Sequence, residues 1–167
     1  MKDRLNVVLF TGGRGASNIV RALNSHDSIS LTLALNAYDD GLSTGKLRKF
    51  LPGMLGPSDV RKNICNLLDI GSDHSQALFD LMEYRFPKIV SRTVAENTIK
   101  NFSLINKKND EVDGLVESLK RRLVQNNFIF LSEALDQFFK YYLKQKSKKK
   151  YFDFSDSSFG NLVFTGI

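Results

Sequence analysis

The sequence predicts an α/β protein that begins with a parallel βαβ unit and continues into a long block of helices. Residues 6–10 and 30–35 are short runs rich in apolar side chains, typical of buried parallel strands. Between them, residues 19–23 space their apolar side chains so that a helix brings them onto one face. Such a strand–helix–strand unit closes with both strands parallel and a right-handed connection. From Ser75 onward the apolar residues recur with helical spacing, so helices follow.

The composition is that of one globular domain. At 167 residues the chain can bury a substantial core, and 42% hydrophobic with 25% charged residues excludes wholesale disorder. No apolar run approaches the ~20 residues that a membrane helix needs, and the N-terminus shows no signal-peptide pattern. The single cysteine, Cys65, lies among apolar helix positions and is expected to be buried. We therefore expect a soluble cytoplasmic protein with no membrane partner.

Most of the net charge of +6 lies in one short run rather than on one face of the fold. Residues 144–150 carry five lysines, and without them the net charge would be +1. A nucleic-acid-binding domain instead spreads its basic residues over a surface that follows the phosphate backbone. The run is therefore interpreted as a solvated linker, and a nucleic-acid partner is not expected. The 13 phenylalanines recur in helical segments and are interpreted as core residues.

Two further segments separate the βαβ unit from the helical block. Residues 36–48 read as a loop that is acidic first, rich in Gly and Ser in the middle and basic at its end. After a proline- and glycine-containing linker, Ser58 or Asp59 is suited to cap a helix that runs to Leu68. The later helices are expected over residues 77–86, 94–102, 113–124 and 131–143, with a further apolar helix beginning within 157–167.

These elements predict a three-part organisation of the chain. Residues 1–70 form a nucleotide-binding βαβ segment, residues 71–150 a helical insertion of the same domain, and residues 151–167 the start of the next core element. Two parallel strands cannot form a stable sheet alone, because parallel sheets need both faces covered. We therefore expect the chain to be the N-terminal part of a larger three-layer domain, truncated at its C-terminal end.

The glycine loop at residues 12–15 is the first segment that could bind a ligand. Glycine lets the backbone approach a ligand closely, and a helix N-terminus offers unpaired N–H groups to a phosphate. A dinucleotide fold would add an acidic residue after the second strand, where Asp39 and Asp40 stand. The fingerprint is imperfect, because Asn18 occupies the place of its third glycine, and no Walker pattern follows the loop. NAD binding is one interpretation of this loop.

The second segment begins with two adjacent carboxylates, Asp39 and Asp40. Their repulsion is costly unless a cation or hydrogen-bond donors offset it, and a Mg²⁺ ion shared with substrate phosphates would do so. Ser43 and Thr44 can offer hydroxyl groups to an anion, and Lys46 adds positive charge. The alternative is a surface turn whose charged side chains face water.

A third segment, residues 56–63, places Asp59, Arg61 and Asn63 at the start of a helix. Asp59 could cap this helix, while Arg61 and Asn63 could point back toward the strand ends. The alternative is an ordinary helix start with solvated charges.

Taken in order, the three segments resemble the 2-phospho-L-lactate transferase-like family, and most closely its bacterial gluconeogenesis-factor branch. The stretches that carry the resemblance are Gly12-Gly13-Arg14-Gly15-Ala16-Ser17, Asp39-Asp40-Gly41-Leu42-Ser43-Thr44-Gly45-Lys46-Leu47-Arg48, Pro57-Ser58-Asp59-Val60-Arg61-Lys62-Asn63 and Gly160-Asn161-Leu162. Three residues depart from the pattern of that branch. Arg14 and Ala16 replace smaller or hydroxyl-bearing loop residues, and Lys62 separates Arg61 from Asn63.

The resemblance implies a Rossmann-like fold that binds a nucleoside diphosphate or a nucleotide sugar at the ends of its strands. The resemblance implies that the backbone of Gly12, Gly13 and Gly15 approaches the diphosphate and that Ser43 and Thr44 bind a phosphate. It also implies that Asp59, Arg61 and Asn161 line the site. Asp39 and Asp40 would be the catalytic pair and the Mg²⁺ ligands.

Three functions stand as expectations. The gluconeogenesis-factor branch implies a nucleotide-sugar-binding regulator linked to carbon metabolism or cell shape. The transferase branch implies the transfer of a phospholactyl-type group from a nucleoside diphosphate to a deazaflavin acceptor, so whether the chain is an enzyme stays open. The glycine loop alone would suit an NAD-binding module. Each function requires a nucleotide partner, and a homodimer is the oligomeric state to test.

Overall fold

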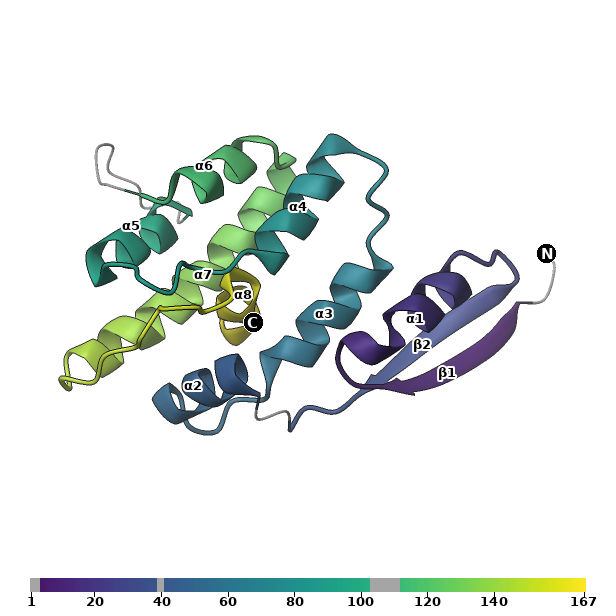
Figure 1. Ribbon diagram of the computed structural model, residues 1–167, viewed down its shortest axis with the longest axis horizontal. Coiled ribbons are helices and arrows are strands. Elements are labelled where there is room, and N and C mark those ends of the chain that lie inside the picture. Colours follow the sequence, from purple (N-terminus) through teal and green to yellow (C-terminus); the bar gives the residue numbers. More distant parts are fainter. Residues whose placement is uncertain (1–3, 39–40, 103–111) are drawn as a thin grey trace.

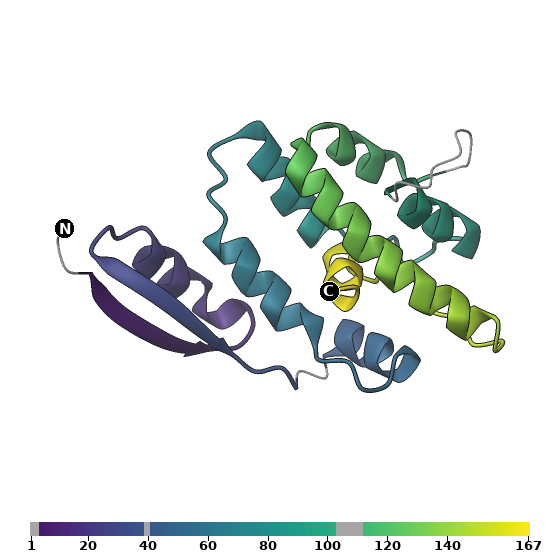
Figure 2. The ribbon, with the colours of Figure 1, turned by 180° about the vertical axis from the view of Figure 1, so that it is seen from behind.

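The computed structural model describes residues 4–38, 41–102 and 112–167, and it is mixed α/β (Figure 1). The elements of this part of the chain are, in order, β1 (Leu5–Thr11), the 3₁₀ helix η1 (Arg14–Ala16), α1 (Ser17–Asn24), β2 (Ile29–Leu35), α2 (Leu42–Phe50), α3 (Pro57–Leu67), α4 (Asp73–Glu83), α5 (Arg92–Phe102), α6 (Gly114–Arg121), α7 (Gln125–Lys146) and α8 (Phe159–Thr165). We call β1, α1 and β2 the arm, and α4 to α8 the bundle. The arm lies on one side of α3 and the bundle on the other (Figure 1, Figure 2).

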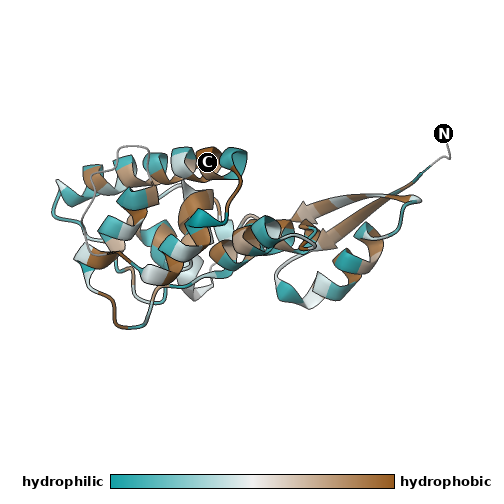
Figure 3. Cartoon of the chain, turned by 90° about the horizontal axis from the view of Figure 1, so that it is seen from above, coloured by the Kyte–Doolittle hydropathy of each residue, from teal (hydrophilic) through white to brown (hydrophobic). Residues whose placement is uncertain are grey.

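The predicted parallel βαβ start is confirmed. β1 and β2 pair in parallel over their whole length, from Leu5 opposite Ile29 to the strand ends. α1 packs against the sheet and against α3, and its Val20 is fully buried. The other face of the sheet is open, since Val8 is 59% and Phe10 83% exposed. Successive strand residues point to opposite faces, so the apolar strands extend away from the bundle with one face uncovered (Figure 3).

The loop predicted for residues 36–48 is wrong in its second half, because α2 begins at Leu42. Leu47 and Phe50 lie on one side of this helix and pack into the same core as the bundle. A short segment with several glycines and charges therefore becomes helical because tertiary packing of two apolar side chains outweighs weak propensity.

α3 follows with Gly56 at its N-cap position and no side chain capping it. The predicted cap by Ser58 or Asp59 is therefore wrong. Pro57 occupies the first helical position, where its missing N–H costs nothing and its fixed φ suits the helix. The side chains of Ser58 and Asp59 are instead engaged in contacts with other elements and with Lys62.

The bundle holds most of the core. α7 packs against α5 and α8, and α8 also contacts α3 and α4. The interpretation of the phenylalanines as core residues is wrong for Phe10 and Phe130, which are exposed. It is confirmed for the buried members of this cluster, which are Phe50, Phe86, Phe102, Phe138, Phe152, Phe154 and Phe159. Their rings meet in tilted and edge-to-face pairs, for example with centroids 5.2 Å apart between Phe102 and Phe159. The predicted helices 94–102 and 131–143 correspond to α5 and to the middle of the longer α7.

α8 lies in the middle of the molecule, in close contact with its neighbours. A Cβ atom on Gly160 would lie 2.4 Å from the carbonyl oxygen of Met82, and one on Gly166 would lie 1.8 Å from that of Ala134. Both positions therefore require glycine. Whether residues 1–70, 71–150 and 151–167 are parts of one larger domain stays a prediction.

The lysine run 144–150 is not wholly a linker, which corrects that interpretation. α7 extends to Lys146, and the Lys146 Nζ lies 2.8 Å from Glu96 Oε1 on α5. Among the helices of the described residues, none is long and apolar enough to span a membrane.

Candidate functional site

The glycine loop lies where β1 ends, against the first turn of α3. A Cβ atom on Gly13 would lie 3.1 Å from Asp59 Oδ1 and 3.2 Å from Lys62 Nζ, while one on Gly12 would lie 3.7 Å from Asp59 Oδ2. At Gly13 any side chain would therefore push the Asp59–Lys62 ion pair, whose charged atoms are 3.1 Å apart. The absence of a side chain is what lets this backbone come so close to α3.

The Asn63 side chain links the glycine loop to α3 by hydrogen bonds. Its Nδ2 donates to the carbonyl oxygens of Gly12, at 2.7 Å, and of Asp59, at 2.8 Å. Asn63 is almost completely buried, yet its Oδ1 has no hydrogen-bond partner within the described residues, and the same holds for Thr11 Oγ1 at the end of β1. Buried polar atoms nearly always have a hydrogen-bond partner, so these two oxygens leave hydrogen-bonding capacity unsatisfied beside the loop.

A second group of polar side chains joins α2, α3 and α8. Asn161 Nδ2 donates to Ser58 Oγ at 2.8 Å and to Ser43 Oγ at 3.0 Å, and Thr44 Oγ1 donates to Ser58 Oγ at 2.7 Å. Thr44, Ser58 and Asn161 are all buried. Residues more than a hundred positions apart in the sequence are thus held together by hydrogen bonds in a low-dielectric setting, where such bonds are strong.

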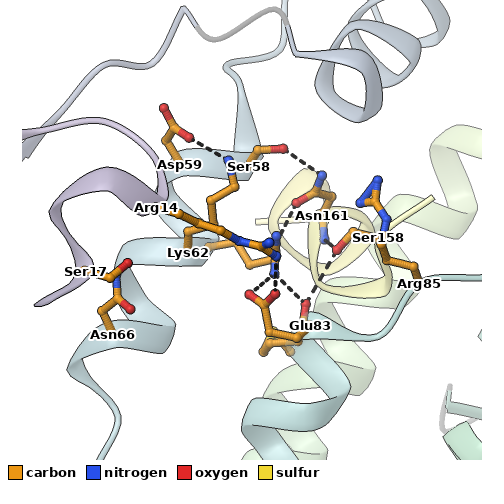
Figure 4. A network of polar contacts seen from close by, with 12 residues as sticks. Arg14, Ser17, Ser58, Asp59, Lys62, Asn66, Glu83, Arg85, Ser158 and Asn161 are labelled. Carbon is orange, nitrogen blue, oxygen red and sulfur yellow. Dashed lines mark hydrogen bonds and ion pairs between the residues drawn. The ribbon is translucent and has the colours of Figure 1, made fainter. Parts of the chain in front are cut away.

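Arg61 connects this group to the bundle, between Asn161 and Glu83, which Figure 4 labels. It is only 3% exposed, and its Nε donates to Asn161 Oδ1 at 2.9 Å while one terminal nitrogen donates to the Met82 carbonyl oxygen and to Glu83. The other carboxylate oxygen of Glu83 accepts from Arg14 Nη2 at 2.9 Å. A buried guanidinium is tolerated when it is paired and hydrogen-bonded in this way.

The electrostatics near this network make Cys65 a neutral thiol. Burial raises the pKa of Cys65 to about 11; the nearby Arg61 lowers it and Glu83 raises it by smaller amounts. The prediction that Cys65 is a buried small side chain is confirmed by its 3% exposure. A thiol with such a pKa is a poor nucleophile near pH 7.

The structure thus places the predicted site residues in two groups that meet on α3. Gly12, Gly13 and Asp59 form the first, at the end of β1. The second consists of Ser43, Thr44, Arg61 and Asn161. Gly15 belongs to neither, since nothing lies within 4 Å of a Cβ placed on it. Asp39 and Asp40 lie outside the described residues.

The expectation that Asn63 points back toward the strand ends is confirmed by its hydrogen bond to the Gly12 carbonyl oxygen. Sequence reasoning missed other members of these groups. Ser58 was open to prediction only as a cap. Glu83, at the end of α4, had no signal at all, because its two arginine partners are distant in sequence.

A metal centre is not formed by the side chains that are described. No group of three His, Cys, Asp or Glu side chains that could hold a metal ion occurs in residues 4–38, 41–102 and 112–167. The expected Mg²⁺ ligands, Asp39 and Asp40, are outside these ranges. The Mg²⁺ site therefore stays a prediction.

Comparison with known proteins decides the family. The family described as "2-phospho-L-lactate transferase CofD" matches residues 7–130, which include the glycine loop, α2 and α3. The chain belongs to this family. The resemblance of the three sequence segments to CofD-like proteins is confirmed.

Curated relatives of this CofD-like chain carry the name of the gluconeogenesis-factor branch. A putative gluconeogenesis factor of Thermotoga maritima is 36% identical over 102 residues, which cover 61% of the chain and 28% of that protein. Gluconeogenesis factors of Bacillus subtilis and Halalkalibacterium halodurans are 34% identical over 88 residues and 40% identical over 81 residues, covering 53% and 48% of the chain. The match covers only 26% and 23% of those two proteins. No solved structure matches the chain significantly.

Proposed function

We propose that this CofD-like chain binds the diphosphate of a nucleotide sugar at the glycine loop, and that it acts as a regulator in carbon metabolism. The names of the curated relatives support the regulatory role, since they are gluconeogenesis factors. The observation that carries the binding proposal is the glycine loop itself, with its close backbone approach to α3 and, beside it, the unpaired Thr11 hydroxyl, which can donate a hydrogen bond to a phosphate.

The backbone at the loop suits an anion. No side-chain hydrogen bond caps η1 or α1, and although the Ser17 N–H donates to the Arg14 carbonyl oxygen, the other first N–H groups of the two helices have no side-chain acceptor. Such N–H groups, together with the positive end of the helix dipole, favour a phosphate. Lys62 Nζ, which stands beside Gly13, would add a cation to one side of that phosphate.

The second group of polar side chains, on α2, α3 and α8, would bind the sugar or the second phosphate of the nucleotide sugar. Ser43 is partly exposed and carries a hydroxyl held by Asn161 at 3.0 Å. Because Asn161 donates to Ser43 Oγ, the Ser43 hydroxyl hydrogen stays available for a ligand. Arg61 would act behind these groups, by fixing Asn161 Oδ1 and hence the direction of the amide.

A second candidate function is catalysis. The matched family is described as a transferase, and on that account the chain would move a phospholactyl-type group from a nucleoside diphosphate to a deazaflavin acceptor. Asp39 and Asp40 would then be the catalytic and Mg²⁺-binding pair. The regulator is preferred because the curated relatives are named gluconeogenesis factors.

The test is a calorimetric titration of the chain with UDP-N-acetylglucosamine, GDP and NAD, each with Mg²⁺ and with EDTA. We expect the UDP-sugar to bind and Gly13→Ala to weaken that binding about tenfold, because the added methyl displaces the Asp59–Lys62 pair beside the phosphate. Gly114→Ala is the matched control, since open space surrounds that position at the start of α6.

Gly15→Ala adds a direct readout of ligand contact. The methyl meets no atom within 4 Å in the free chain, so any loss of affinity reports the ligand rather than the fold. Binding of none of the three nucleotides would contradict the proposal, and preference for NAD would favour the dinucleotide interpretation. Turnover of a phospholactyl donor would favour the transferase.

A further inference from the structure

A cavity beside the glycine loop lies between η1, α1, α3 and α4 and shares Arg14, Lys62 and Glu83 with the contacts described above. Its volume is about 220 Å³. The side chains on its wall that matter for the argument are Arg14, Ser17, Arg21, Lys62, Asn66 and Glu83. Figure 4 shows Arg14 and Glu83 pointing toward one another, while the side chain of Lys62 extends to Asp59 and Ser17 contacts Asn66.

Positive charge dominates this wall. Arg14, Arg21 and Lys62 face a single lining carboxylate, Glu83. Glu83 already accepts hydrogen bonds from Arg14 and from the buried Arg61 behind it. A concave surface lined by one sign of charge concentrates counter-ions, so the cavity attracts an anion.

Arg21 is the cation on this wall whose charge is not paired within the described residues. Among the described residues its guanidinium has no hydrogen-bond or ion-pair partner, whereas Lys62 is paired with Asp59. Arg14 donates from Nη2 to Glu83, which leaves its other N–H groups available as donors. Two guanidinium groups therefore have donors to offer, and guanidinium binds phosphate with paired, charge-assisted hydrogen bonds.

Neutral donors complete the wall. Asn66 Nδ2 donates to Ser17 Oγ at 3.0 Å, which leaves the Ser17 hydroxyl hydrogen and the second Asn66 N–H for a ligand. Cys65, also on the wall, is an uncharged thiol because burial raises its pKa to about 11, so it does not repel an anion. The cavity thus combines cations from η1, α1 and α3 with oriented neutral donors from α1 and α3.

We propose that this cavity is an anion subsite that takes the phosphate group of a small molecule other than the nucleotide. The site is built from Arg14 and Arg21 as cations and from Ser17 and Asn66 as neutral donors, with Lys62 at its edge toward the glycine loop. It goes beyond the proposed nucleotide site, because Arg21, Ser17 and Asn66 belong to neither group of predicted site residues. A phosphorylated metabolite bound there would contact α1, α3 and α4 together and so couple the arm to the bundle.

The experiment is an NMR titration of the full chain with inorganic phosphate, with chloride and acetate as comparison anions at constant ionic strength. We expect amide shifts at Ser17, Arg21 and Asn66 with phosphate, and Arg21→Gln to weaken the phosphate affinity about tenfold. Arg121→Gln on α6 is the matched control, since it removes the same charge from a side chain that is 77% exposed and outside the cavity.

Phosphate binding with equal affinity in both variants would overturn the proposal, and so would an effect of chloride as large as that of phosphate. Acetate binding as tightly as phosphate would overturn the ligand class. Arg21 is exposed and without a described partner, so the variant is expected to keep the fold, which the spectrum of Arg21→Gln verifies directly. Asn66→Asp, which adds a negative charge to the wall, should also weaken phosphate binding.

Discussion

Phe10 in the arm and Phe138 in the bundle are the same side chain in opposite surroundings. Phe10 is 83% exposed on the open face of the sheet, whereas Phe138 is fully buried within the aromatic cluster. The difference extends to the elements around them. The arm has a two-stranded sheet with one uncovered face, while the bundle encloses its helices around a shared core.

The comparison shows that the candidate site is held in place by α3 rather than by a core of the arm. Asn63 on α3 hydrogen-bonds to Gly12 in the glycine loop, and Asn66 on α3 hydrogen-bonds to Ser17, the first residue of α1. α3 in turn is fixed to the bundle through Arg61. Regions with few buried apolar contacts open at low free energy, so we expect the arm to be the less stable region and the bundle its support.

The largest expected difference in unfolding free energy is between the alanine variants of the two phenylalanines. Phe138→Ala should lower the free energy of unfolding by about 3–5 kcal/mol, because it removes a buried ring and leaves a cavity. Phe10→Ala should change it by less than about 0.5 kcal/mol, because the ring is already in contact with water. Denaturant unfolding followed by circular dichroism measures both. Equal losses would contradict the description of the arm as uncovered.

The next effect concerns the residue that joins the two regions. Arg61→Leu should cost about 3 kcal/mol, because Glu83, Asn161 and the Met82 carbonyl lose a buried donor. The control is Arg121→Leu, whose exposed guanidinium makes only a surface ion pair with Glu117. A cost near zero for Arg61→Leu in thermal and denaturant unfolding would show that the arm and bundle are not connected through this side chain.

A smaller, pH-dependent effect is expected where α2 meets the segment after α7. Hydrogen bonds from Lys46, and then from Ser155, lower the pKa of Asp153 to about 2, against 3.8 in an unfolded chain. Because the folded pKa is the lower one, the stabilisation exists above pH 3.8 and is lost as the pH falls toward about 2. Asp153 is largely exposed, so solvent screening limits the contribution to under about 1 kcal/mol.

Asp153→Asn should therefore be slightly less stable than the unaltered chain near neutral pH and equally stable near pH 2. Glu133→Gln on α7 serves as the matched control, because this exposed carboxylate has no ion pair among the described residues. Unfolding curves collected across this pH range measure the difference. A constant gap between Asp153→Asn and the unaltered chain at every pH would contradict the assignment.

The sequence was most informative where structure is local. The apolar runs of β1 and β2, the spacing in α5 and the glycine loop all follow from neighbouring residues, and the fold class is confirmed. α2 was missed because Leu47 and Phe50 become an apolar face only against the bundle. The cap at Ser58 was wrong because Thr44 and Asn161, both distant in sequence, engage its hydroxyl.

The candidate site follows the same division. Resemblance to the family identified Arg61 and Asn161 as site residues, and the structure joins them by a hydrogen bond of 2.9 Å. Glu83 and the cavity beside Arg21 could not be read from the sequence, since they depend on how α4 packs near α1 and α3. Long-range packing of charged groups has no short-range pattern to read.

Amide hydrogen exchange, with and without a UDP-sugar and Mg²⁺, tests the central claim most directly. In the free chain, we expect the amides of β1 and β2 to exchange faster than those in the middle of α7. The nucleotide should slow exchange at residues 12–17, around the glycine loop, and leave α7 unchanged. Protection confined to the bundle, or no protection at the loop while the nucleotide is bound, would contradict the account.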